Sequence, residues 1–360
     1  MSASTHNILV IRRRYLGDIV LLVPVFRNLR LHWPQARLTA LVEPSYAEVL
    51  ALDPDVDAVV PLPRSGAGLG VWWRTLRALR RGRFTHVFDF DNTDKTALLA
   101  RCTGAGLRAT FHRESISCKH GWAYTYIARV SNQDYDQQHI TETYLRLLPA
   151  AGVPVVSREF RLAPRAADLA ALQKLSPFDF RPATPRLLVH PGSRSPFRLW
   201  PSERFARVID RVQRELGTRV FLTAGPGEEP VVAEIARQCT NPPVVIDAAL
   251  TIPQLGALLS LFPVLLCHDS GPMHLAAAVG ARVIALYGSQ NATIWRPLGA
   301  GHTMLQTPLP CTCLPDAPTP CVKQDAYRSY CVRKLTEDEV FAAVAKTLLH
   351  DRPAAGGLPP

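Results

Sequence analysis

The chain has 360 residues, a length that predicts two domains of about 150 residues each, and 47% hydrophobic residues, enough for buried sheets. A charged content of 20% argues against a disordered or coiled-coil protein, and eight cysteines do not make a disulfide scaffold in a chain this long. The net charge of +11 leaves nucleic acid, an anionic membrane surface and a phosphorylated substrate open as partners.

The sequence has no uninterrupted apolar run of the roughly 18 residues that a transmembrane helix needs. Its first seven residues are polar and lead directly into an apolar run, so we expect no secretory signal. A reducing cytoplasm is therefore the expected location.

The first half of the chain alternates short apolar runs with helical patterns. We expect strands at 8–11, 38–42, 58–60 and 86–90, and helices at 19–31, 46–52, 72–81 and 140–148. The segment 111–150 is otherwise less regular. This alternation predicts a doubly wound α/β domain.

The second half repeats the scheme after a proline-rich boundary zone at 163–185. Strands are expected at 187–190, 220–223, 244–246, 264–267 and 283–287, and helices at 202–216, 229–239, 252–262, 273–279 and 335–349. The expected organisation is an α/β protein with two Rossmann-like domains, 1–165 and 186–350, a linker at 166–185 and a flexible tail at 351–360.

In parallel sheets of this kind, ligands bind beyond the carboxyl ends of the strands. The first polar turn at such a position places Asp18 at the start of a helix. Its carboxylate either complements the helix dipole or serves as a general base.

The second turn runs from 191 to 201 and precedes a helix. It offers Ser193, Arg194 and Arg198, the hydroxyl and guanidinium groups that a phosphate clamp needs. Surface arginines on a loop are the alternative interpretation.

The third turn, 269–274, joins a buried-strand pattern to an Ala-rich helix that ends near Gly280. Asp269 or Ser270 can cap this helix, and Pro272 fits its first turn. The free N–H groups and the positive helix end suit a phosphate, which His274 could also reach. An ordinary strand-to-helix turn with a good cap is the alternative.

Several other motifs are absent or ambiguous. The sequence has no P-loop, no G-x-S-x-G elbow and no dinucleotide fingerprint after a strand. Asp89-Phe90-Asp91 has the spelling of a metal-binding DxD motif, but it lies in the first domain and we interpret it as structural or as part of a substrate site there, not as a metal site. Cysteines cluster at 311, 313, 321 and 331 with a spacing too irregular to indicate zinc, so metal binding, pairing and free thiols all stay open.

The three turns together resemble glycosyltransferase family 9, the heptosyltransferases of the inner core of bacterial lipopolysaccharide. Ile11-Arg12 through Leu16-Gly17-Asp18-Ile19-Val20 is similar to the opening signature of the family. Pro191-Gly192-Ser193 through Arg198-Leu199-Trp200-Pro201 resembles its second block. Asp269 to Ala276, with Tyr287-Gly288 and Trp295-Arg296-Pro297, resembles its third and most specific block.

This resemblance implies a GT-B fold, with two Rossmann-like domains facing a central cleft, the acceptor on the N-terminal side and the nucleotide sugar on the C-terminal side. It implies an inverting, metal-independent transfer from ADP-heptose to the lipopolysaccharide core, with no cofactor. Asp18 matches the general base, and Arg198 would offset charge on the leaving ADP. The resemblance implies a donor site at Gly17, Ser193, Arg194, Glu228 or Glu229, Asp269, Ser270, Gly271, Pro272, Met273 and His274.

A lipid A–sugar acceptor would lie at the cytoplasmic face of the inner membrane, where a peripheral protein could dock through basic residues of the first domain. Candidates are Arg74, Arg77, Arg80, Arg81 and Arg83, each of which could equally belong to a solvated helix face. The dispersed charge and the lack of a binding motif argue against nucleic acid. Transfer of another nucleotide sugar, or a catalytically silent nucleotide-sugar-binding protein, are the alternative functions.

Overall fold

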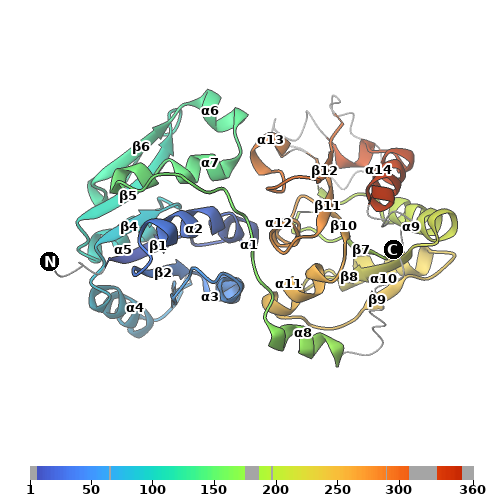
Figure 1. Ribbon diagram of the computed structural model, residues 1–360, viewed down its shortest axis with the longest axis horizontal. Helices are drawn as coiled ribbons and strands as arrows, with labels where there is room; N and C mark the ends of the chain where they lie inside the picture. The colour runs from blue at the N-terminus through green and yellow to red at the C-terminus, as the bar shows by residue number, and fades with distance from the viewer. Residues whose placement is uncertain are drawn as a thin grey trace, which may run out of the picture. The chain divides into compact units, whose positions relative to one another are not determined.

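The computed structural model describes residues 6–64, 66–174, 186–195, 198–288, 290–307 and 331–350. The chain divides into two compact units, Met1–Ala163 and Pro164–Pro360, each built on a six-stranded parallel sheet (Figure 1). The predicted α/β class with two Rossmann-like domains is thus confirmed. The second unit includes helix α8 (Ala166–Gln173), which packs against α11 (Ile252–Ser260), so part of the segment expected as a linker is a helix. Residues 175–185 and the expected tail at 351–360 lie outside the described ranges.

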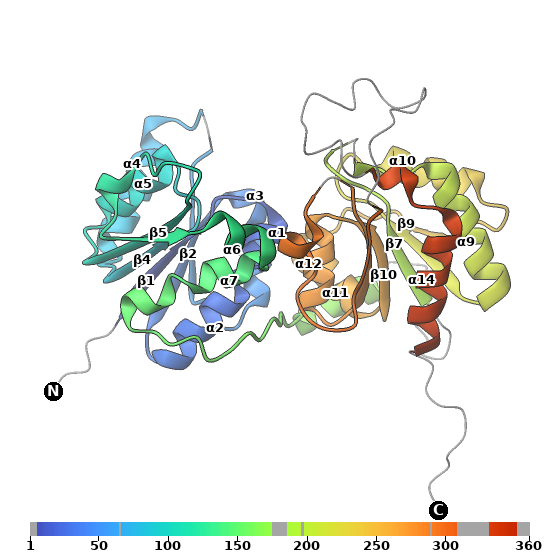
Figure 2. The ribbon, with the colours of Figure 1, turned by 90° about the horizontal axis from the view of Figure 1, so that it is seen from above.

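The first unit has the strand order β3-β2-β1-β4-β5-β6. Its strands are β1 (Asn7–Ile11), β2 (Arg37–Val42), β3 (Ala58–Pro61), β4 (His86–Asp89), β5 (Leu107–Arg113) and β6 (Tyr126–Val130). Its helices are α1 (Leu16–Val20), α2 (Val23–His32), α3 (Pro44–Ala47), α4 (Leu69–Arg81), α5 (Asp94–Cys102), α6 (Asn132–Gln137) and α7 (Ile140–Leu145). Figure 2 shows α4 and α5 on one side of the sheet and α2 and α7 on the other.

The second unit has the strand order β12-β11-β10-β7-β8-β9. Its strands are β7 (Arg186–His190), β8 (Arg219–Thr223), β9 (Val244–Ile246), β10 (Val264–His268), β11 (Arg282–Leu286) and β12 (Thr303–Leu305). Its other helices are α9 (Ser202–Leu216), α10 (Glu229–Gln238), α12 (Gly271–Ala278), α13 (Ala292–Trp295) and α14 (Glu337–His350). The central strands β7 and β10 are buried almost throughout, which explains why they read as continuous apolar runs.

The expected helix at 19–31 is two helices, α1 and α2, with Leu21 and Leu22 between them. Pro24 lies in the first turn of α2, where its missing N–H costs nothing, and it cannot continue a helix from α1. The expected helix at 46–52 is likewise divided into α3 and a 3₁₀ turn, Glu48–Leu52.

No helix in the described ranges is long and apolar enough to cross a membrane.

Candidate functional site

Asp18 lies just beyond the carboxyl end of β1, in the first turn of α1. One oxygen of its carboxylate accepts a hydrogen bond from the backbone N–H of Tyr15 at 3.0 Å, which caps the helix. The other oxygen accepts a hydrogen bond from the Arg12 guanidinium. Asp18 therefore caps the start of α1, while its side chain remains 17% exposed beside a strong cation.

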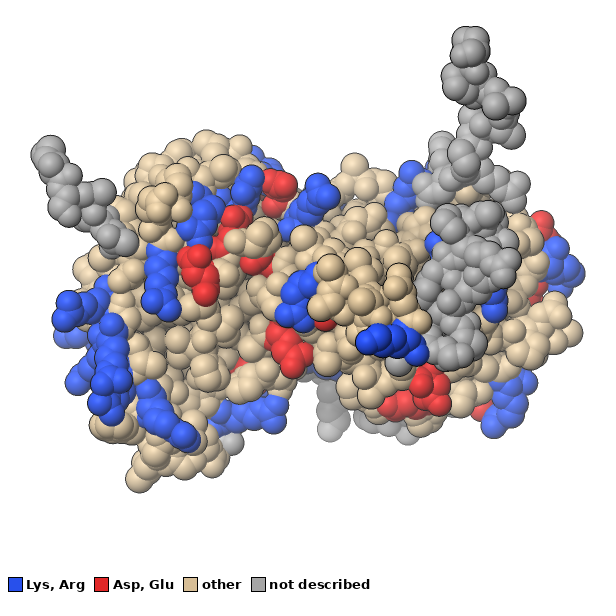
Figure 3. Space-filling view, turned by 60° about the horizontal axis from the view of Figure 1, so that its bottom comes forward, with Lys and Arg blue, Asp and Glu red and all other residues tan. Residues whose placement is uncertain are grey.

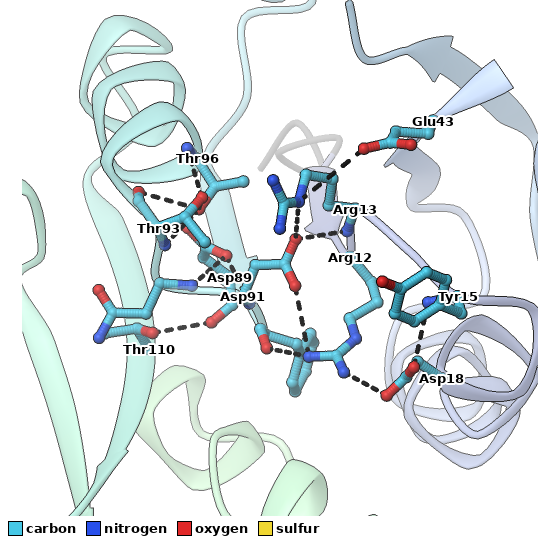
Figure 4. Close-up of polar contacts among 12 residues, drawn as sticks. Arg12, Arg13, Tyr15, Asp18, Glu43, Asp89, Asp91, Thr93, Thr96 and Thr110 are labelled. Carbon is cyan, nitrogen blue, oxygen red and sulfur yellow. Dashed lines mark hydrogen bonds and ion pairs between the residues drawn. The ribbon is translucent and has the colours of Figure 1, made fainter. Parts of the chain in front are cut away.

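The Arg12 side chain ties Asp18 to the next strand of the sheet (Figure 4). Its Nη1 donates to the carbonyl of Phe90 at 2.5 Å and lies 3.4 Å from Asp91 Oδ1. The backbone N–H of Arg13 donates to Asp91 Oδ2 at 2.6 Å. Because β1 pairs directly with β4, the ends of these two strands lie side by side, and Asp91 fixes the arginine that fixes Asp18.

Asp89 supports this arrangement from within the sheet. It is fully buried and accepts hydrogen bonds from the Tyr124 hydroxyl at 2.7 Å and from the backbone N–H groups of Asp91 at 2.9 Å and Asn92 at 3.2 Å. Burial raises the pKa of Asp89 to about 6. Both carboxylates of the Asp89-Phe90-Asp91 sequence are thus engaged by the protein itself. In the residues that the structure describes, no group of three or more His, Cys, Asp and Glu side chains is arranged to hold a metal ion.

In the second unit, the turn between β10 and α12 meets the loop that follows β7. Ser270 is the residue before α12, and Pro272 lies in the first turn of the helix, as predicted. Nη1 of Arg198 donates to Asp269 Oδ2 at 3.1 Å, although the two residues are 71 positions apart. Among the described residues, neither Ser270 Oγ nor Arg198 Nε has a hydrogen-bond partner, although both atoms are buried. The start of α12 therefore carries polar groups that a ligand could satisfy.

A buried histidine fixes the two loops to each other. His268 is the last residue of β10, one residue beyond the strand expected at 264–267, and is fully buried. Its Nε2 accepts a hydrogen bond from the backbone N–H of Trp200 at 2.8 Å. Burial lowers the pKa of His268 to about 3, so the ring is neutral and can accept this bond at ordinary pH. The bond holds the 198–200 segment, and hence Arg198, against β10.

Of the two neighbouring glutamates, Glu228 is the one beside the ends of the central strands. Its Oε2 accepts a hydrogen bond from the backbone N–H of Gly225 at 2.8 Å and lies 3.3 Å from His190 Nε2. The carboxylate rests on Gly192, where any side chain would collide with it. Glu229 begins α10 and is exposed.

The remaining predicted residues differ in what their side chains can offer. Ser193 accepts a hydrogen bond from the backbone N–H of Ser195 at 3.4 Å, and Arg194 is exposed. Met273 and His274 are buried within α12, where Met273 accepts a hydrogen bond from the Tyr287 hydroxyl at 3.4 Å. Gly17 is buried in α1 of the first unit, whereas the other predicted donor residues belong to the second unit.

Sequence reasoning did not identify Arg12, Asp91 or His190 as members of these clusters. Each of them lies at or just beyond the carboxyl end of a strand, a position that could have drawn attention to it. Their contacts depend on the pairing of β1 with β4 and on the approach of Glu228 to β7, which the order of strands in the chain does not reveal.

Two doubly wound domains with polar clusters at the carboxyl ends of their central strands match the GT-B fold of solved heptosyltransferase structures. The model of glycosyltransferase family 9 (heptosyltransferase) matches residues 72–325. The chain belongs to this family.

Similar proteins include lipopolysaccharide heptosyltransferase 3 of Escherichia coli K12, which is 29% identical over 297 residues, 79% of this chain and 83% of that protein. Among solved structures, a family 9 glycosyltransferase from Veillonella parvula matches with a TM-score of 0.82 and 22% identity over 98% of this chain and 99% of that chain. The Escherichia coli heptosyltransferase WaaC with ADP matches with a TM-score of 0.73 and 17% identity over 95% and 99%.

Three of the four clustered cysteines, 311, 313 and 321, lie outside the described residues. Cys331 is a free thiol and is partly buried.

Proposed function

We propose that this glycosyltransferase transfers a heptose from ADP-heptose to the inner core of lipopolysaccharide, with inversion at the anomeric carbon and without a metal ion. The observation that carries the proposal is the start of α12, where Ser270 Oγ and Arg198 Nε are buried with their hydrogen-bonding capacity unused by the described residues. A diphosphate would satisfy both groups and the free N–H groups of the helix. Relatives named as lipopolysaccharide heptosyltransferases support the choice of sugar and acceptor.

In this mechanism, Asp18 takes the proton from the acceptor hydroxyl while the hydroxyl oxygen attacks the anomeric carbon. The bond between that carbon and the β-phosphate oxygen breaks, and ADP leaves with the bonding electrons. Arg198 and the N-terminus of α12 offset the charge that develops on ADP. Asp269 holds Arg198 in position through the 3.1 Å contact.

Glu228, rather than Glu229, would contribute to the donor site. Its carboxylate lies over Gly192 beside the second sequence block, and a carboxylate there can accept hydrogen bonds from hydroxyl groups of the donor. Ser193 and Arg194 belong to the same loop, while Gly271, Pro272, Met273 and His274 form the first turn of α12.

We further propose that the protein acts at the cytoplasmic face of the inner membrane as a peripheral protein. The net charge of +11 supports this because an acceptor embedded in an anionic leaflet attracts a basic protein. Transfer of another nucleotide sugar to a lipid-linked glycan is the second candidate, since the groups at the start of α12 suit a diphosphate and do not by themselves select one sugar.

The test measures ADP release by the purified protein with ADP-heptose, heptose-deficient lipopolysaccharide and EDTA. We expect turnover by the native protein and a loss of about 10²–10⁴-fold in kcat for Asp18→Asn, which keeps the cap but cannot take a proton. Glu48→Gln, an exposed carboxylate of the same unit, should leave kcat unchanged.

Arg198→Gln should lower kcat by about 10²-fold or more, because it removes a cation from the leaving group. Arg237→Gln, an exposed arginine of the same unit, serves as its control. Turnover that stops with EDTA would contradict the metal-free mechanism. Binding of ADP-heptose without transfer would point to a silent binder, and transfer only from another nucleotide sugar would replace the heptose assignment.

A further inference from the structure

Helix α4 presents large apolar side chains to solvent. Leu69 is 89% exposed and Trp73 is 59% exposed, and both lie in the N-terminal half of the helix, one turn apart. The opposite side of α4 is packed in the core through Thr75 and Leu79, so the exposure follows from the orientation of the helix. A large indole and a leucine side by side on a surface indicate a contact with something apolar.

The rest of the exposed face is basic. Arg74, Arg77, Arg80 and Arg81 are all exposed, and the helix sequence LGVWWRTLRALRR contains no acidic residue. Within the described ranges none of these four arginines forms an ion pair, and Arg77 lies over the Trp73 ring at 5.1 Å. Figure 3 shows basic side chains gathered at the end of the first unit that includes α4, with no acidic side chain among them.

A second exposed apolar pair lies in the segment that follows β5. Ile116 is 60% exposed and Trp122 is 62% exposed. This segment contacts the start of α5 through His120 and Asp94 at 2.7 Å, and α5 packs against α4. Both apolar pairs follow the carboxyl ends of strands in the first sheet, the same edge that carries Asp18.

We propose that the α4 surface, formed by Leu69, Trp73, Arg74, Arg77, Arg80 and Arg81, docks on an anionic lipid bilayer. Tryptophan and leucine insert at the boundary between headgroups and acyl chains, while arginines pair with lipid phosphates. The complementary charge identifies the partner as anionic, and the apolar side chains distinguish a bilayer from a purely polar polyanion. This inference rests on the proposed function for its purpose, which is to bring the Asp18 edge to a lipid-linked acceptor.

The test is co-sedimentation of the full chain with vesicles of phosphatidylethanolamine and phosphatidylglycerol, with neither donor nor acceptor present. We expect binding that is lost on vesicles of phosphatidylcholine alone. Replacing all four arginines of the α4 surface with glutamine should weaken binding by about 100-fold or more, since each contributes about fivefold. Trp73→Ala should weaken it by about tenfold.

The control changes the same amount of charge elsewhere: Arg207, Arg211, Arg214 and Arg237 of the second unit to glutamine. A loss equal to that of the α4 variant would mean that net charge alone drives binding and would overturn the proposal. So would retention on RNA without any binding to vesicles. Quenching of tryptophan fluorescence by brominated lipid should fall in Trp73→Phe, and an unchanged quenching would also contradict docking through α4.

Failure of the docking proposal can be distinguished from failure of the proposed transfer reaction. If the α4 surface docks as proposed, the four-arginine variant should lose transfer to acceptor embedded in vesicles but keep transfer to acceptor in detergent. If the proposed transfer is wrong, vesicle binding by the native chain should persist without any transfer in either medium.

Discussion

The residue that fixes Asp18 is Arg12, and it is held more firmly than Asp18 itself. Its side chain is 14% exposed and contacts Asp18, Asp91 and the carbonyl of Phe90. A guanidinium can make these contacts at once because its donors lie in a fixed plane, whereas an ammonium cannot. The position of the proposed base therefore depends on the shape of Arg12 as well as on its charge.

Arg12→Lys should accordingly lower kcat by about tenfold while changing KM for ADP-heptose little. The substitution retains the positive charge but loses the planar set of donors that positions Asp18. Steady-state kinetics with both substrates varied would measure this. Arg37→Lys, an exposed arginine at the start of β2, is the matched control. An unchanged kcat in Arg12→Lys would show that charge alone suffices.

Asp53 is a buried carboxyl whose ionisation opposes folding. Burial raises its pKa from 3.8 to about 7, and a carboxyl with a raised pKa stabilises the fold below pH 3.8 and loses that contribution as pH rises through 7. The difference corresponds to on the order of 4 kcal/mol at pH 8.

Asp53→Asn should raise the free energy of unfolding at pH 8 by about 2–4 kcal/mol and have little effect at pH 4. The amide oxygen can still accept the hydrogen bond from the backbone N–H of Asp55. Urea denaturation at pH 4 and pH 8 would measure the free energy of unfolding of both proteins. An equal difference at the two pH values would contradict a raised pKa of Asp53.

At the scale of elements, His268 joins β10 to the segment that precedes α9. A histidine whose pKa is lowered by burial stabilises the fold above its unfolded pKa of 6.5 and loses that contribution as pH falls toward 3. The loss between pH 6.5 and pH 4 is roughly 3 kcal/mol.

Between pH 6.5 and pH 4, His268→Gln should lose roughly 3 kcal/mol less of its free energy of unfolding than the native protein. Glutamine does not titrate, and its side-chain oxygen can accept the hydrogen bond from the backbone N–H of Trp200. Thermal unfolding of both proteins from pH 7 to pH 4 would measure the difference. Parallel curves would mean that His268 does not titrate on unfolding.

How far the sequence predicts an element depends on its burial. β1, β7 and β10 are buried on both faces and read as apolar runs, so they were predicted correctly. β5 and β6 were missed because they are only partly buried and carry arginine and histidine among their apolar residues. The helix expected at 335–349 is α14, and Thr336 accepts a hydrogen bond from the backbone N–H of Glu339 at 3.2 Å at its start.

The sequence predicts which residues belong to the candidate site better than it predicts their contacts. Asp18, Arg198 and Asp269 could be proposed because each occupies a turn after a strand. The contacts of Asp18 with Arg12, and of Arg198 with Asp269, could not, because they depend on side-chain direction and on which strands are neighbours in the sheet.

At the scale of the whole molecule, the net charge of +11 produces an electrostatic field whose range depends on the salt concentration. The Debye length falls from about 30 Å at 0.01 M to about 8 Å at 0.15 M ionic strength. Under the proposed function, an acceptor embedded in an anionic membrane would feel the long-range field, whereas ADP-heptose would be held by contacts at short range.

The KM for vesicle-embedded acceptor should therefore rise several-fold between these salt concentrations, and the KM for ADP-heptose should change less. The variant that lacks the four α4 arginines should show a weaker dependence on salt. If both KM values rise equally in the native protein, the charge does not act through the acceptor.

The contact between Glu228 and Gly192 also couples these two positions. The carboxylate occupies the space that a Cβ at position 192 would need, and it is held there by the backbone N–H of Gly225. The atoms in the way are the far end of a flexible side chain, so a side chain at position 192 would displace the carboxylate rather than the backbone. The side chain at position 192 thus decides whether the Glu228 carboxylate can reach the backbone N–H of Gly225, and the two positions are coupled through that contact.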